Sequence, residues 1–202
     1  MLIDMPTTLR DQIAADSYDE VEEQLALHPE EAQALGQYNL FSQKSQALPL
    51  HYLCRRSKAN VSVLRAMIEA SPADALIHQD SSSKSTPLHV ACWYQLNPDA
   101  IKFLVERNKQ ALLVPDAYGN LPVHLVASFH PQAPELVTLF LSYFPETAAY
   151  LNDKEQTAVH QLKWRKDVDT KLQRDVLRAY PQKSKYHVQG LLGSVASLWK
   201  PR

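Results

Sequence analysis

The chain has 202 residues, of which 45% are hydrophobic, and a formal net charge of -1. This apolar content is sufficient for a packed core. Residues 1–16 contain no basic segment followed by an apolar core, and no apolar run approaches the ~20 residues of a membrane span. We therefore expect a soluble protein inside the cell, in the cytoplasm or the nucleus.

The first predicted elements are two helices within residues 7–27. Leu9 and Ile13 are one helical turn apart, and Val21 and Leu25 repeat this spacing, which is typical of amphipathic helices. The following segment, 36–46, is polar and shows no sustained alternation of β-branched residues. We predict an enlarged loop there.

A short motif that ends in histidine then recurs along the chain. Pro-Leu-His ends at His51 and again at His89, Pro-Val-His ends at His124, and Ala-Val-His ends at His160. These histidines are 38, 35 and 36 residues apart. A period of this size indicates a repeat array, in which each unit buries its apolar face against its neighbours.

The residues around the motif predict a turn followed by a short helix. In the second copy Thr86 precedes Pro87, so that a hydroxyl N-cap is followed by proline at the first helical position. Asp116, Gly119 and Asn120 favour a turn before the third copy. A second apolar run at helical spacing follows each motif, and the runs begin at Val61, Ala100, Leu136 and Leu172.

Two groups of small polar residues need no functional explanation at this stage. Cys54 and Cys92 occupy the same place after successive motif histidines, and we expect them to be small buried residues rather than part of a disulfide framework. The serines of segment 81–83 lie in a turn, which we interpret as an exposed linker, with phosphorylation as the alternative.

Turn, Thr-Pro-Leu-His-x-Ala-Cys, short helix, loop and longer helix at this period resemble the ankyrin repeat. The specific matches are 86–92 and 116–126, and the resemblance covers roughly residues 7–182. It implies an all-α solenoid of about five helix-turn-helix repeats with turn fingers. The approximate repeats are 7–45, 46–83, 84–119, 120–155 and 156–182, and an amphipathic helix at 183–202 follows them.

The chain departs from the repeat pattern at several positions. Leu48 and Leu121 replace the threonine of the motif, and Glu155 occupies the position of the turn glycine. The loops between the paired helices contain Asn97-Pro98 and Pro131 instead of Gly-His. We therefore expect these loops to be longer than is usual for the family.

The motif histidines are interpreted as structural. Helices in adjacent repeats lie about 8 to 10 Å apart, whereas the ligands of a zinc ion all lie about 2 Å from it. We therefore expect no metal, and we expect each imidazole to bond turn backbone or the cap hydroxyl. The chain contains no nucleophile motif and no glycine-rich phosphate loop. We predict that it is not an enzyme and that it binds no cofactor.

The residues four and five positions after each motif histidine are the candidate partner-binding residues. The resemblance implies that these positions face the concave groove, and most are residue types enriched at interface hot spots. We add two residues at the best-formed finger tip. The predicted partner-binding set is Arg55, Arg56, Trp93, Tyr94, Tyr118, Asn120, Phe129, Trp164 and Arg165. The alternative is that the aromatic side chains pack into the loops between helices.

Charge is distributed unevenly along the chain. Residues 1–35 carry a net charge of -8, and residues 161–202 carry +7. The basic end suggests a protein partner with an acidic or mixed apolar surface, and its candidate docking patch consists of Lys163, Arg165, Lys166, Lys171 and Arg174. Residues 183–202 have one apolar stripe, which predicts a helix that caps the array or docks on a partner.

The sequence thus favours a monomeric, non-catalytic protein-binding module, with no nucleic acid and no membrane among its partners. Two alternatives stay open. One is a self-assembling structural adaptor, which would associate with itself as its concentration rises. The other is a hydrolase or metal site among the histidines.

Overall fold

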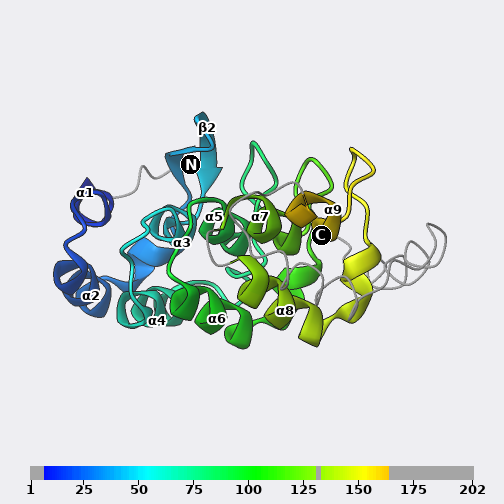
Figure 1. Cartoon of the computed structure of the whole chain (residues 1–202). Coiled ribbons are helices and arrows are strands. Elements are labelled where there is room, and N and C mark those ends of the chain that lie inside the picture. Colours follow the sequence, from blue (N-terminus) through cyan, green and yellow to red (C-terminus); the bar gives the residue numbers. More distant parts are fainter. Residues whose placement is uncertain (1–6, 131–132, 164–202) are drawn as a thin grey trace.

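The computed structural model describes residues 7–130 and 133–163, which are mostly helical with one two-stranded antiparallel sheet. Figure 1 shows the order of the elements. The α-helices are α1 (Thr7–Ala15), α2 (Tyr18–Leu27), α3 (Pro49–Cys54), α4 (Val61–Ala70), α5 (Pro87–Trp93), α6 (Pro98–Arg107), α7 (Pro122–Phe129), α8 (Ala133–Tyr143) and α9 (Ala158–Lys163). The strands are β1 (Gly36–Leu40) and β2 (Gln43–Ala47), and short 3₁₀ helices cover Pro29–Gln33, Lys109–Leu113 and Pro145–Ala149.

The helices lie in two rows, which the sequence predicted as short and longer helices. Helices α3, α5, α7 and α9 form one row, in which each contacts the next, and α2, α4 and α6 contact one another in sequence in the other row (Figure 1). Buried leucine and valine side chains from both rows form one core. The loops that precede α5, α7 and α9 project beyond the first row, on the same side as the sheet (Figure 1).

The predicted helix boundaries are confirmed at several points. Helices α3, α5 and α7 begin at the motif prolines, where the missing N–H would have had no partner in the helix. Asn60 and Asn97 cap α4 and α6, since their side-chain oxygens accept hydrogen bonds from Val63 N at 3.0 Å and Ala100 N at 2.9 Å. The second helices α2, α4 and α8 each end two residues before a proline.

The prediction of a loop at 36–46 was wrong, because this segment forms the β1–β2 hairpin. Gly36 pairs with Ala47 and Leu40 pairs with Gln43. In β1 Tyr38 and Leu40 are buried while their neighbours are exposed, so the strand alternates without β-branched residues. Phe41 and Ser42 have φ of 49° and 65°, as a two-residue primed turn requires.

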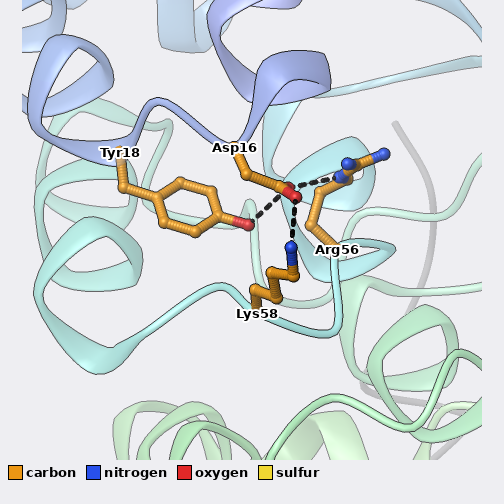
Figure 2. A network of polar contacts seen from close by, with 4 residues as sticks. All are labelled: Asp16, Tyr18, Arg56 and Lys58. Carbon is orange, nitrogen blue, oxygen red and sulfur yellow. Dashed lines mark hydrogen bonds and ion pairs between the residues drawn. The ribbon is translucent and has the colours of Figure 1, made fainter.

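The first helix pair is tied to the α3–α4 loop by a charged network around Asp16 (Figure 2). The Asp16 carboxylate accepts from Arg56 Nε at 2.8 Å and from the Tyr18 hydroxyl at 2.8 Å, and Lys58 Nζ lies 3.7 Å away. The hydrogen bond from Arg56 is the main reason why the pKa of Asp16 is lowered to about 2. The network fixes the start of the helical rows.

Several predicted features lie outside the described residues. They are the helix at 183–202, the second helix of the last predicted repeat, the basic patch apart from Lys163, and the candidate residues Trp164 and Arg165. Within the described part of the chain, none of the helices has the length and apolar character needed to cross a membrane.

Substitutions at Leu88 and Leu9 test whether the interior of the helical rows contributes more to the free energy of unfolding than their end does. Both side chains are buried, but α5 is flanked by α3 and α7, whereas α1 lies at one end of the helices and makes its main contacts with α2 and α3. We expect Leu88→Ala to lower the free energy of unfolding by about 2 to 5 kcal/mol and Leu9→Ala to lower it less, as measured by denaturant titration with circular dichroism. A larger loss for Leu9→Ala would contradict the assignment of the first pair as an end.

Candidate functional site

Three finger turns, 80–85, 116–120 and 152–156, border the candidate site. They begin at Asp80, Asp116 and Asn152, which are spaced 36 residues apart. In each turn the N–H of the first residue donates to the carbonyl of the last, at 2.9 to 3.0 Å. The side-chain oxygen of the first residue accepts further N–H groups of its own turn. Each finger is therefore closed by one Asp or Asn.

The first finger turn contains a buried carboxylate surrounded by serines. Asp80 accepts hydrogen bonds from the Ser45, Ser82 and Ser83 hydroxyls and from the N–H groups of residues 82, 83 and 85. Burial alone would raise the pKa of Asp80, but the hydrogen bonds from Ser45 and Ser83 hold it well below its usual value. The interpretation of 81–83 as an exposed linker was wrong for Ser83, whose side chain is buried.

A backbone ladder joins successive fingers. Ser81 N donates to Gln46 O on β2, Ala117 N donates to Ser83 O, and Asp153 N donates to Tyr118 O, at 2.8 to 3.1 Å. Gly119 has φ of 70°, and a Cβ there would lie 2.6 Å from Asp153 Oδ1. Glycine thus suits both the positive φ of the turn and the close approach of the next finger.

The motif histidines connect each short helix to the following turn. Nε2 of His89 lies 3.0 Å from Asn120 O, and Nε2 of His124 lies 3.2 Å from Tyr150 O and Gln156 O. A carbonyl only accepts, so Nε2 carries the proton and Nδ1 accepts, in His89 from the N–H of Thr86. These two histidines are therefore neutral, and they bond turn backbone as predicted from the sequence.

The first and last motif histidines differ from this arrangement. His51 Nε2 bonds His78 O at 3.0 Å, but its buried Nδ1 has no hydrogen-bond partner. Nδ1 of His160 accepts from Thr157 N at 3.2 Å. Burial lowers the pKa of His51 and of His124 to about 4, and it also lowers the pKa of His89.

Three aromatic side chains cluster where short helices end. The ring of Trp93, at the end of α5, lies 4.1 Å from the ring of Phe129, at the end of α7, between centroids. Phe41, at the tip of the hairpin, meets Trp93 edge to face at 5.3 Å. Trp93 and Phe129 remain 38% and 39% exposed. We call Phe41, Trp93 and Phe129 the aromatic cluster.

A groove of about 670 Å³ lies between the aromatic cluster and the three finger turns. The cluster, Leu125 and the exposed ring of Tyr118 supply its apolar lining. Its polar lining comes from the fingers and from Ser128 and Gln161, whose side chains are bonded to each other at 2.7 Å. The volume lies in the range of ligand pockets.

The structure separates the predicted binding residues into three groups. Trp93, Phe129, Tyr118 and Asn120 line the groove, although Asn120 is also held within the fingers by Asp116 and Asn152. The second group, Arg55 and Tyr94, lies beside the hairpin: Arg55 Nη1 donates to Asn39 O, and the Tyr94 hydroxyl accepts from Phe41 N. The third is Arg56, which pairs with Asp16 and does not line the groove.

Phe41 is a groove residue that the sequence did not reveal. It lies in the segment predicted as a loop, and no copy of the repeated motif includes it. The two-residue turn between Leu40 and Gln43 brings Phe41 to the end of α5, so that its position depends on the hairpin. The sequence signal for a strand here was the alternation of Tyr38 and Leu40 with polar residues, followed by the apolar Phe41.

The described residues contain no group of three or more His, Cys, Asp and Glu side chains that could hold a metal ion. Cys54 and Cys92 are buried, and burial raises the pKa of both thiols. No family model matches the chain, and no curated protein matches it either.

The buried histidines predict a loss of stability in mild acid. Their pKa is lower in the folded state than the ordinary value of 6.5, so the unfolded chain binds more protons below pH 6.5. Stability is fully present above that pH and falls as the pH drops toward 4. We expect about 2 kcal/mol of loss per histidine at pH 5, measured by urea unfolding between pH 7.5 and 4.5.

Two variants test whether the buried histidines cause this dependence of stability on pH. His124→Gln should be less stable at pH 7.5 and should lose less stability on acidification. His28→Gln is the control, because the His28 side chain is 52% exposed, and it should keep the original dependence. An unchanged pH dependence in His124→Gln would contradict the histidine explanation.

Proposed function

We propose that the chain is an ankyrin-type solenoid that binds a partner protein without catalysing a reaction. Three observations support this architecture: the recurring motif histidines, the two rows of helices, and the finger turns at an interval of 36 residues. The histidine bonds to the following turn support the same assignment, because they connect neighbouring units as a repeat array requires.

The proposed binding function rests mainly on the exposed aromatic side chains of the groove. Trp93, Phe129 and Tyr118 leave large apolar surfaces open to water along one groove. Contiguous exposed apolar surface is uncommon on monomeric proteins and marks interaction sites. Tryptophan and tyrosine are also enriched among residues whose truncation costs most in protein binding. A partner that covers the groove would remove this surface from water.

The chemistry of the described residues favours recognition over catalysis. A nucleophile needs a nearby base that is free to take its proton. The imidazoles of His89 and His124 are buried and bonded at both nitrogens, and the thiols of Cys54 and Cys92 are buried. The groove itself offers hydroxyl, amide and carboxylate groups, which suit hydrogen bonding.

Substitution of Trp93 tests the proposal. We expect Trp93→Ala to weaken partner binding by about 2 kcal/mol or more, while the circular dichroism spectrum stays unchanged because the side chain is already 38% exposed. Phe129→Ala should act in the same direction. The measurement is affinity capture with the full chain, followed by titration calorimetry with the captured protein.

Leu27→Ala is the matched control. Leu27 is a large apolar residue with 68% exposure on α2, outside the groove, and its loss should leave binding intact. Equal binding by Trp93→Ala and the unmodified chain would contradict the proposal that the groove is the binding site. Unfolding of Trp93→Ala would instead assign Trp93 to the core.

A further inference from the structure

The two walls of the groove differ in chemistry. The aromatic cluster forms the wall at the helix ends, and Leu125 lies beside it. On the finger side Tyr118, which is exposed, is bonded through its backbone to two carboxylate residues: its N–H donates to Asp116 Oδ1 at 2.8 Å, and its carbonyl accepts from Asp153 N at 3.1 Å. Both carboxylate residues line the groove.

Neither of these carboxylates forms an ion pair with a lysine or arginine of the described residues. Asp116 is held in place by its own turn, through the backbone and side-chain N–H groups of Asn120. Asp153 is exposed. Lys154 is the single cationic residue of the lining, against two anionic ones. The finger side therefore presents an exposed aromatic face with a net negative charge beside it.

We propose that the groove binds an extended peptide segment of a partner that carries one bulky apolar residue and one lysine or arginine. The apolar side chain packs against Trp93 and Phe129. The cationic side chain lies over the ring of Tyr118, beside the Asp153 carboxylate, where charge attraction and the ring face act together. This inference rests on the proposed protein-binding function and adds the chemistry of the partner.

The shape and polar lining of the groove fit a peptide better than a folded surface. The hairpin tip and the finger turns border a volume of about 670 Å³, which suits a segment of a few residues. Gln161 accepts from Ser128 through Oε1, so its amide NH₂ group remains to donate to a carbonyl of an extended backbone. Gln156 contributes a second amide to the lining.

The experiment uses the full chain and synthetic fluorescent heptapeptides. Each peptide contains one leucine or tryptophan. In three matched sets, arginine, glutamine or glutamate is placed at each of the remaining positions, one position at a time. Fluorescence polarisation gives the dissociation constants. We expect the best arginine peptide to bind about three- to five-fold tighter than its glutamine counterpart, as for an exposed ion pair assisted by a ring contact. The glutamate counterpart should bind more weakly still.

Two variants locate the charge preference. Asp153→Asn should reduce the difference between the arginine and glutamine peptides to within about two-fold, and added salt should reduce it in the unmodified chain. Asp99→Asn is the matched control, because Asp99 is 84% exposed on α6 and lies outside the groove. It should keep the preference.

The outcomes separate this inference from the proposed function. Peptides that bind through Trp93 with no preference for arginine, or with a preference for glutamate, would overturn the cationic partner and leave the binding groove in place. Failure of every peptide to bind through Trp93 would overturn the peptide assignment, and the titration with the captured protein would then decide the proposed function separately.

Two further probes test other occupants of the groove. A synthetic peptide of residues 183–202 contains apolar residues together with Lys183, Lys185, Lys200 and Arg202. If it binds tightest of all probes and depends on Trp93 and Asp153, the groove belongs to the chain's own C-terminal segment and the assignment to a separate partner fails. Sedimentation showing self-association that Trp93→Ala abolishes would assign the groove to a second copy.

Discussion

The bond from a buried motif histidine to the carbonyl of the following turn is the constraint on which the groove depends. His89 reaches Asn120 O, and His124 reaches Tyr150 O and Gln156 O. A buried carbonyl and a buried imidazole N–H would each be costly without a partner, so the bond fixes where the finger lies over the helix. The backbone hydrogen bonds between fingers then fix each finger relative to the next one. The groove has one rigid wall because its turns are bonded in two directions.

The other wall is set by packing at the helix ends. Trp93 and Phe129 end successive short helices, and their rings contact each other. The hairpin tip closes one side of the cluster, because Phe41 N donates to the Tyr94 hydroxyl while its ring meets Trp93. The aromatic surface is thereby held in place in the free chain, which would lower the entropy lost in the proposed binding.

The sequence predicts the helical pairs well because proline, asparagine and the apolar spacing each act locally. It predicts the histidine role for the same reason, since Thr86 and His89 are three residues apart. The hairpin, the Asp80 cluster and the Arg56 pairing could not be predicted in this way. Each joins residues more than 30 positions apart or depends on alternation in a segment without β-branched residues. Ser45 and Asp80 show this most clearly, because a polar strand residue supplies the hydroxyl that a distant buried carboxylate requires.

The charge of the groove limits how it achieves specificity. An ion pair at this exposed site contributes about 1 kcal/mol or less. Charge alone therefore does not select a partner, and in the proposed complex the larger part of the affinity would come from the apolar residue packed against the aromatic cluster.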